Sequence, residues 1–262
     1  MLCRWLILLS LLVTSVVQAA LVDRDANYSS GATLMKGYIV YDDAVKGERP
    51  AVLVVHEWWG HNEYSRDRAR QLAQMGYVAM AVDMYGNARQ ALHPEDAKKF
   101  SGEIANNIDL GKQRFLAAMS QLQQHKLVDA EKMAAIGYCF GGAVVLQMAR
   151  EGVDLRGVVS FHGSLATDNF ARPGSVKARV MVAHGAEDPF VPALHITNFI
   201  NEMNKTGVNY KFIVYSGAQH SFTNPAADDY GRRFNLPLKY NRKADLDSWN
   251  DMQVFLKDVF SQ

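Results

Sequence analysis

Gly137-Tyr138-Cys139-Phe140-Gly141 places one cysteine between two glycines. An apolar run at 133–136 precedes this stretch, and a helix-like run at 143–150 follows it. Where a strand turns sharply into a helix, the central residue adopts a strained backbone conformation, and the residues two before and two after it must be almost free of side chain. The two glycines meet that need. The stretch therefore predicts a strand, a tight turn and a helix whose N-terminus favours thiolate over thiol at Cys139.

Further apolar runs alternate with helix-length segments along the chain, which indicates an α/β fold with a mostly parallel central sheet and helices on both faces. Strands are expected at 51–55, 77–82, 133–138, 157–161, 179–183 and 210–215. Helices are expected near 64–75, 95–123, 140–151, 193–206 and 245–260. The alternating segment 33–40 is expected to be an antiparallel edge strand. No repeat or shift in composition divides the chain.

The first 19 residues have the pattern of a secretory signal peptide. Arg4 precedes the apolar run 5–17, and Val17 and Ala19 are small or short residues at the positions that signal peptidase reads. The run is shorter than the about 20 apolar residues that span a bilayer. We therefore expect residues 20–262 to be a single exported domain, periplasmic or secreted, without a stable membrane anchor. An uncleaved interfacial anchor is the alternative.

The charge balance argues against nucleic acid as a partner. The chain has 28 Lys and Arg against 27 Asp and Glu, and loss of Arg4 makes the balance 27 to 27. The densest basic pairs, 98–99 and 232–233, stand alone. Nucleic-acid binding relies on clustered positive charge, which is missing here. Small, modestly charged substrates are expected instead.

Cysteine use points to chemistry at the turn. Cys3 would leave with the signal peptide, so Cys139 would be a lone thiol without an internal disulfide. A thiol nucleophile needs a base, and the base needs a group that orients it. Asp188 follows the strand expected at 179–183, and His220 follows the strand expected at 210–215. The order Cys, Asp, His matches nucleophile, acid and base in α/β-hydrolases.

The chain resembles the dienelactone hydrolase family, within the α/β-hydrolase fold, in four segments that follow the family's order. They are Val-Val-His-Glu-Trp-Trp-Gly at 54–60, Gly-Tyr-Cys-Phe-Gly-Gly at 137–142, His-Gly-Ala-Glu-Asp-Pro at 184–189 and Gly-Ala-Gln-His-Ser-Phe at 217–222. The resemblance implies Cys139 as nucleophile, His220 as general base and acid, and Asp188 as its orienting partner.

The resemblance also implies supporting roles around the thiol. It gives Glu57 a role in activating the thiol, and it makes the backbone N–H groups of Trp58 and Phe140 the donors of an oxyanion hole. Each role has a structural alternative. Cys139 could be an inert buried cysteine, His220 could cap a loop, Glu187 could stand in for Asp188, and Glu57 could be a structural partner of a neighbouring group.

The chain departs from the family pattern where the substrate would bind. Asn87 and Asn224 stand where the best-known members carry arginines that bind the substrate carboxylate, and Arg89 or Arg232 would have to replace them. Without such cations an anionic lactone loses its partners. Aromatic residues are expected to line the substrate pocket, namely Trp59, Tyr85 and Phe222.

No cofactor or metal is expected. His56 and His61 superficially resemble a zinc-binding helix motif, but they lie five positions apart rather than four, and the segment ends a strand. Asp83, which follows the next strand, is expected to tether a loop.

The sequence therefore predicts a cysteine-dependent hydrolase of small carboxylic esters or lactones that works through an acyl-thioester intermediate. The alternative is a non-catalytic, hydrolase-like binding protein for small molecules.

Overall fold

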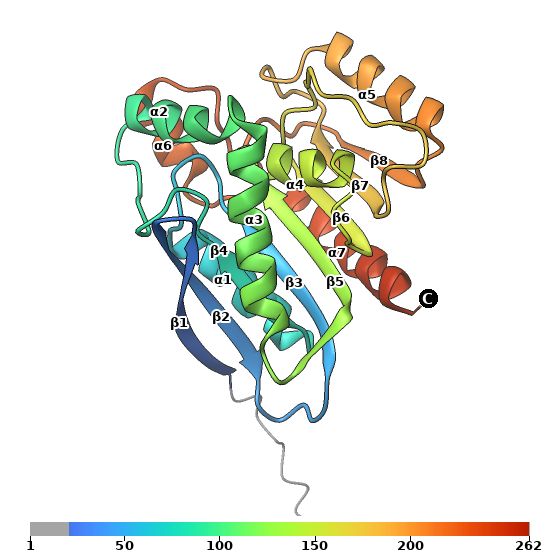
Figure 1. The fold of residues 1–262 in the computed structure, drawn as a ribbon. Helices are drawn as coiled ribbons and strands as arrows, with labels where there is room; N and C mark the ends of the chain where they lie inside the picture. Colours follow the sequence, from blue (N-terminus) through green and yellow to red (C-terminus); the bar gives the residue numbers. More distant parts are fainter. Residues whose placement is uncertain (1–20, 262) are drawn as a thin grey trace, which may run out of the picture.

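A sheet of eight strands runs through the part of the chain that the computed structural model describes, residues 21–261 (Figure 1). The strand order is β1-β2-β4-β3-β5-β6-β7-β8. The strands are β1 Leu21–Ser30, β2 Thr33–Asp42, β3 Arg49–Val55, β4 Val78–Val82, β5 Val128–Tyr138, β6 Gly157–Phe161, β7 Arg179–Gly185 and β8 Tyr210–Tyr215. From β4 to β8 every neighbouring pair is parallel, whereas β1 and β2 are antiparallel.

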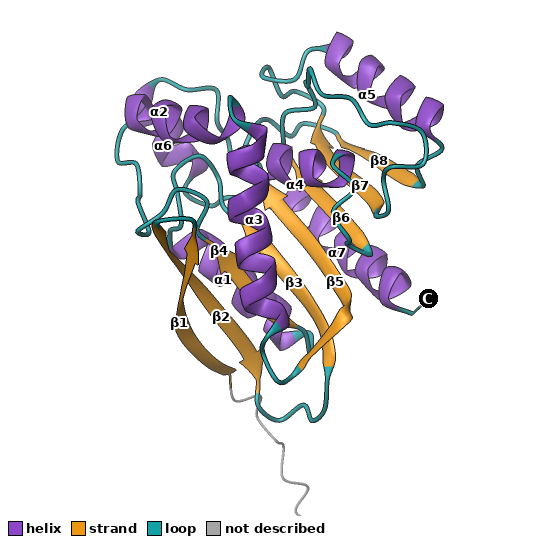
Figure 2. Cartoon of the chain, in the orientation of Figure 1, coloured by secondary structure: helices purple, strands orange, loops and turns teal. Residues whose placement is uncertain are grey.

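Helices cover both faces of the sheet (Figure 2). They are α1 Glu63–Gln74, α2 Pro94–Ala105, α3 Ile108–Gln123, α4 Phe140–Arg150, α5 Ala193–Thr206, α6 Ala227–Phe234 and α7 Arg242–Phe260. Helices α3, α4 and α5 pack on one apolar core, and α1 and α7 pack on the other. Strand β3 serves both cores, because Leu53 and Val55 face one side and Val52 and Val54 face the other. This arrangement confirms the α/β class predicted from the sequence.

The prediction that 33–40 forms the edge of the sheet is wrong. Strand β1 pairs with β2 over its whole length, from Leu21 opposite Asp42 to Ser30 opposite Thr33, and β2 also pairs with β4. The edge is therefore β1. Its first half is polar and exposed, as edge strands commonly are, so it carries no apolar run that would reveal a strand.

The single helix expected at 95–123 is also wrong, because two helices occupy that range. Helix α2 ends at Ala105 and α3 begins at Ile108. The side chain of Asn107 accepts a hydrogen bond from the N–H of Leu110 at 3.0 Å, which makes Asn107 the N-cap of α3. The Asn107 cap therefore begins a second helix at a point where the apolar periodicity of the sequence alone predicts one continuous helix.

The turn from β5 into α4 has the strained geometry expected for Cys139, whose φ is 53° and ψ −114°. The chain is crowded on both sides of it. A Cβ added to Gly137 would lie 2.1 Å from the carbonyl oxygen of Gly141, and a Cβ added to Gly141 would lie 2.3 Å from that of Val55. Only glycine therefore lets the start of α4 approach the ends of β5 and β3.

Gly137→Ala is expected to lower the free energy of unfolding by about 1–3 kcal/mol, because the added methyl group overlaps backbone that cannot move without opening the turn. Urea denaturation measures the change. Gly47→Ala is a useful control, because nothing lies within 4 Å of a Cβ there and only the positive φ of 83° opposes the substitution. A Gly137→Ala protein as stable as the wild type would mean that the turn relaxes freely.

Within residues 21–261, no helix is both long and apolar enough to cross a membrane. The predicted signal peptide at 1–19 lies outside the described residues.

Candidate active site

Cys139 lies at the carboxyl edge of the sheet, as the N-cap of α4, and is a half-buried free thiol. Its position is fixed from the neighbouring strand. Its backbone N–H points to the carbonyl oxygen of Phe161 at 3.0 Å and to Nδ1 of His162 at 3.1 Å. The sulfur is therefore presented by a backbone that is held on both sides of the turn.

Asp188 and His220 come from the loops after β7 and β8 and meet at the same edge of the sheet. Nδ1 of His220 lies 2.8 Å from Oδ2 of Asp188, and the Asp188 side chain is fully buried. Oδ1 of Asp188 accepts the N–H of Phe190 at 2.9 Å, which holds the carboxylate in its turn. With Nδ1 donating to Asp188, Nε2 of His220 is left to face another group.

That other group is the thiol of Cys139, which lies close enough to His220 to act on the pKa of its imidazole by charge and hydrogen bonding. Burial lowers the pKa of His220, but the negative charge of a Cys139 thiolate and the hydrogen bond to Asp188 outweigh it and raise the pKa to about 10. The imidazole is therefore protonated at neutral pH when the sulfur is ionised. The structure brings together the three residues that the sequence placed on three separate loops.

The raised pKa of His220 predicts how stability depends on pH. The value is 6.5 for the unfolded chain and about 10 in the fold, so between these values the folded state keeps a proton that the unfolded state releases. The contribution of His220 to stability is fully present below pH 6.5 and is lost as the pH rises toward 10. Urea denaturation at pH 7 and pH 9.5 should show a larger fall in the free energy of unfolding for the wild type than for His220→Gln.

Cys139→Ala is the matched comparison for this pH effect, because it removes the negative charge that raises the pKa of His220 most strongly. Its stability should fall less between the two pH values than that of the wild type. Equal slopes in the wild type and His220→Gln would contradict the prediction.

Glu57 lies just after β3 and is buried. Oε1 accepts the hydroxyl of Ser221 at 2.9 Å, and Oε2 accepts the amide of Asn224 at 2.5 Å. Burial raises the pKa of Glu57, and these hydrogen bonds oppose that effect. The carboxylate is thus tied to the loop that carries His220 rather than to the thiol. The predicted part of Glu57 in activating the thiol stays a prediction.

The two backbone segments predicted to form an oxyanion hole lie next to each other. Phe140 is the first residue of α4, so its N–H has no acceptor within the helix. Trp58 lies in the loop after β3, and its carbonyl oxygen accepts the hydroxyl of Tyr85 at 3.0 Å. The close approach of Gly141 to the end of β3 joins these segments. Their role as donors stays a prediction.

The three aromatic residues predicted to line the pocket are almost completely buried. The exposed fractions are 2% for Trp59, 1% for Tyr85 and 0% for Phe222. Trp59 stacks on Tyr230 of α6 with ring centroids 4.3 Å apart. These buried rings pack within the protein around the site. Their direct contact with a substrate stays a prediction.

The candidate replacement arginines have partners within the protein. Arg89 donates to the carbonyl oxygen of Tyr85 at 2.6 Å and to Glu103 at 2.8 Å. The side chain of Arg232 is 73% exposed and pairs with Asp229 on α6. Asn224, one of the two asparagines that stand at the family's arginine positions, donates to Glu57.

His162 is a site residue that the sequence reasoning missed. It is 1% exposed, and its Nε2 lies 2.7 Å from the hydroxyl of Thr223 in the loop that carries His220. Burial, together with the charges of His220 and Arg68, holds the pKa of His162 well below its usual range. The ring is therefore neutral, with Nδ1 accepting from the Cys139 N–H. The sequence signal that could have identified His162 is its position directly after β6, since Asp188 and His220 also lie after strands.

The prediction that Asp83 tethers a loop is confirmed, since its carboxylate accepts the N–H groups of Tyr85 at 2.9 Å and Gly86 at 2.8 Å.

In residues 21–261 no three His, Cys, Asp or Glu side chains group closely enough to hold a metal ion.

Comparison with known proteins agrees with the predicted family and fold. The dienelactone hydrolase family profile matches residues 35–260. A protein from Bradyrhizobium, named as a probable 2-oxo-3-(5-oxofuran-2-ylidene)propanoate lactonase, is 28% identical over 225 residues, which cover 81% of this chain and 85% of that protein. The crystal structure of a dienelactone hydrolase-like promiscuous phosphotriesterase from metagenomic libraries is 33% identical and superposes with a TM-score of 0.86, covering 92% of this chain and 99% of its own. Dienelactone hydrolase from Anabaena variabilis shares the fold, with 19% identity, a TM-score of 0.60 and coverage of 82% of this chain and 98% of its own.

Proposed function

The chain belongs to the dienelactone hydrolase family, and on that premise we propose that it is a cysteine-dependent hydrolase of small carboxylic esters or lactones. The observation that carries the proposal is the connected arrangement at the edge of the sheet. The Cys139 thiol lies beside His220, whose Nδ1 lies 2.8 Å from Oδ2 of Asp188. This is the arrangement of nucleophile, base and orienting carboxylate that acyl transfer requires.

The reaction would proceed in two halves. The Cys139 thiolate attacks the carbonyl carbon, and the oxyanion accepts the N–H groups of Trp58 and Phe140. When the C–O bond breaks, the leaving alkoxide takes the Nε2 proton of His220, and the acyl group stays on sulfur as a thioester. His220 then removes a proton from water, whose oxygen attacks the thioester, and the carboxylic acid leaves as the thiolate forms again. Asp188 stabilises the imidazolium throughout.

Esters and lactones suit this site better than amides. An alkoxide or enolate leaves without the strong protonation that an amine requires. The surroundings also favour neutral substrates, because Asn87 and Asn224 stand where the best-known family members carry arginines. A substrate carboxylate would therefore find no arginine to pair with at these positions.

Trapping the intermediate tests the proposal. The protein is mixed with an activated aryl ester, quenched in acid within the first turnover and digested for mass spectrometry. One acyl group on the peptide that contains Cys139 is expected, and it should disappear as the ester is consumed. Turnover with an adduct on another residue, or no ester hydrolysis across a broad panel, would overturn the proposal. The second result, with ligand binding retained in Cys139→Ser, would favour a binding protein.

Phosphotriester hydrolysis is a second candidate activity. The metagenomic relative, 33% identical to this chain, is described as a promiscuous phosphotriesterase. Phosphotriesters are uncharged, like the esters proposed here, and a thiolate can attack phosphorus as it attacks a carbonyl carbon. Release of 4-nitrophenol from a diethyl aryl phosphotriester, lost in Cys139→Ala, would support this activity. No release by the wild type would refute the activity, and release that persists in Cys139→Ala would show that Cys139 is not its nucleophile.

We also propose that the protein acts outside the cytoplasm and has no nucleic-acid partner. The charged and apolar pattern of residues 4–19 supports export. The lack of clustered positive charge in the sequence supports the absence of a nucleic-acid partner. Expression of the full chain in a bacterial host, followed by fractionation and N-terminal sequencing, should give a periplasmic or secreted protein that begins at Ala20. An unprocessed chain in the cytoplasm would contradict the proposal.

A further inference from the structure

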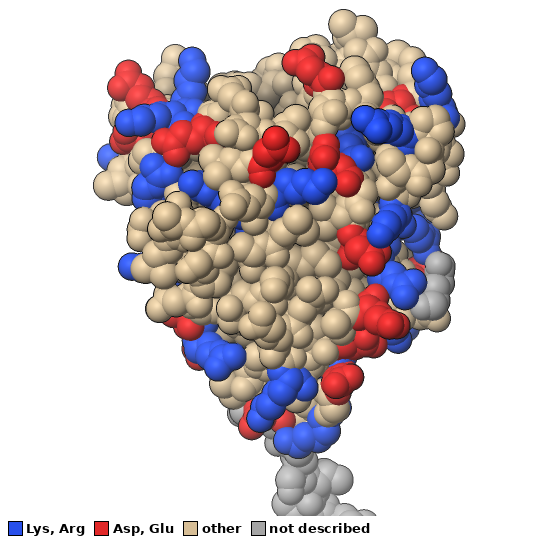
Figure 3. All heavy atoms as spheres, viewed as in Figure 1, with Lys and Arg blue, Asp and Glu red and all other residues tan. Residues whose placement is uncertain are grey.

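A groove of about 540 Å³ runs over α4 at the edge of the sheet that carries Cys139. Its walls come from the junction of α2 and α3, the segment 165–170 and the start of α5. Figure 3 shows the molecule hollowed at this edge, between the part that contains α2 and the part that contains α5. Most of its lining is apolar, including Ile104, Ile108, Val144, Leu165, Phe170 and Leu194. Its volume lies in the range of small-molecule sites.

The groove begins beside the nucleophile. It follows one face of α4, because the residues of this helix that line it are spaced three and four apart. They are Phe140, Ala143, Val144, Gln147, Met148 and Arg150. Cys139 is the N-cap of the same helix, and its carbonyl oxygen accepts the N–H of Ala143 at 3.2 Å. The first lining residue, Phe140, follows the thiol directly.

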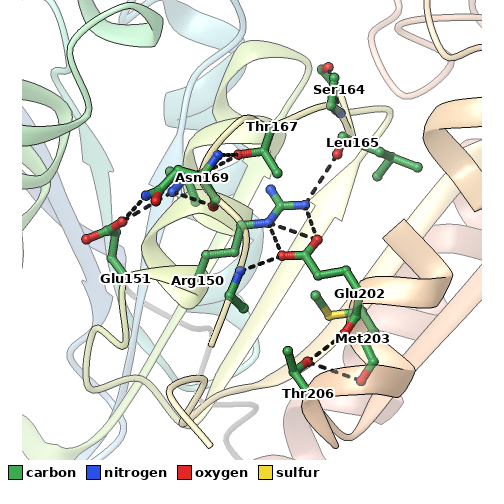
Figure 4. Close-up of polar contacts among 12 residues, drawn as sticks. Arg150, Glu151, Ser164, Leu165, Thr167, Asn169, Glu202, Met203 and Thr206 are labelled. Carbon is green, nitrogen blue, oxygen red and sulfur yellow. Dashed lines mark hydrogen bonds and ion pairs between the residues drawn. The ribbon is translucent and has the colours of Figure 1, made fainter. Parts of the chain in front are cut away.

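Three polar side chains of the groove, those of Arg150, Gln147 and Thr167, have partners in the protein. Arg150, its only lysine or arginine among the described lining residues, pairs with Glu202, and both side chains are 3% exposed. Gln147 accepts the hydroxyl of Thr167 at 3.1 Å. Figure 4 shows the Arg150–Glu202 pair and the contact of Arg150 with Leu165, which fasten the segment after β6 to α4 and α5. The groove thus offers apolar surface without an available cation, and Asp168 adds an exposed carboxylate at its rim.

We propose that this groove holds the unbranched apolar acyl chain of a neutral ester, an inference that rests on the proposed function. The leaving oxygen must lie near His220, which protonates it. The groove starts at Phe140, the residue after the thiol, and its lining includes neither His220 nor its neighbours Asp188 and Phe190. The part of the substrate in the groove is therefore the acyl chain rather than the alcohol.

The apolar lining predicts a dependence on chain length. Each methylene group buried in the transition state raises kcat/KM by about fourfold. With 4-nitrophenyl esters from acetate to octanoate, kcat/KM should rise with each added methylene until the groove is filled. An alkyl acetate series, from methyl to octyl, should show little such rise.

Leu194→Glu tests the location. Leu194 lines the groove and is 66% exposed, so the substitution places a charge in the groove without removing a core residue. The octanoate-to-acetate ratio of kcat/KM should fall about tenfold or more. Ala166→Trp, at an exposed lining position, should shift the optimum to shorter acyl chains. Leu246→Glu is the matched control, on the far face of the sheet in α7 and 53% exposed, and should leave the ratio unchanged.

The outcomes separate the two proposals. If no ester is hydrolysed by the wild type, the proposed function fails. If esters are hydrolysed but the ratio is the same in wild type and Leu194→Glu, only the groove assignment is overturned. A change confined to the alkyl acetate series would assign the groove to the alcohol and would also overturn it.

Discussion

Cys139→Ala should lower kcat/KM for activated aryl esters by about 10⁴-fold or more, because the variant loses the atom that we propose forms the covalent intermediate. No neighbouring group can replace it. Both oxygens of Glu57 are engaged by Ser221 and Asn224, and His162 is neutral, with both ring nitrogens hydrogen-bonded. Initial rates measured at substrate concentrations well below KM would give the ratio directly.

Cys139→Ser is the comparison for this result, since it keeps a smaller nucleophile at the same turn. Both variants should keep the secondary structure of the wild type, because a thiol-to-methyl or thiol-to-hydroxyl change leaves the glycines around the turn untouched. A Cys139→Ala protein that retains a tenth or more of the wild-type rate would show that another residue is the nucleophile.

The meeting of Cys139, Asp188 and His220 could be predicted because each lies just after a strand or in the loop that follows one. The carboxyl ends of parallel strands meet at one edge of a sheet, so Cys139, Asp188 and His220 had to approach one another there. The neutral His162 obeys the same rule, but nothing in its sequence surroundings separates it from a core histidine. The partners of Glu57 lie 164 and 167 positions away and depend on how two loops pack, which no local pattern encodes.

The outer parts of the fold were harder to predict than its centre. Strands such as β3 are buried on both faces, so they appear as uninterrupted apolar runs. Strand β1 is a polar edge, and α6 is a short helix in which only Ala227 is buried. Neither element was predicted, since few of their residues are buried and neither contains a long apolar run. Helix α6 nevertheless matters near the site, because its Tyr230 stacks on Trp59.

The ion pair between Arg150 and Glu202 joins three elements around the groove. Nε and Nη2 of Arg150 each donate to a Glu202 oxygen at 2.9 Å, and Nη2 also donates to the carbonyl oxygen of Leu165 at 3.3 Å (Figure 4). Oε1 of Glu202 accepts the N–H of Ala171 at 2.8 Å. Helix α4, the segment after β6 and helix α5 thus share one buried, hydrogen-bonded pair of charges.

Glu202→Ala should therefore lower the free energy of unfolding by about 3–5 kcal/mol, because it leaves the Arg150 guanidinium buried without its counter-charge and the Ala171 N–H without its acceptor. Glu103→Ala removes the partner of Arg89 from a pair that is about one-third exposed, 34% and 36%, and should cost at most about 1 kcal/mol. Urea denaturation of the two variants at pH 7 gives the comparison. Equal losses would mean that water reaches Arg150 and that the wall of the groove is looser than its hydrogen bonds imply. Because a buried charge without its partner is costly only where water stays out, the difference between the two variants measures how firmly the fold closes around the segment that borders the groove.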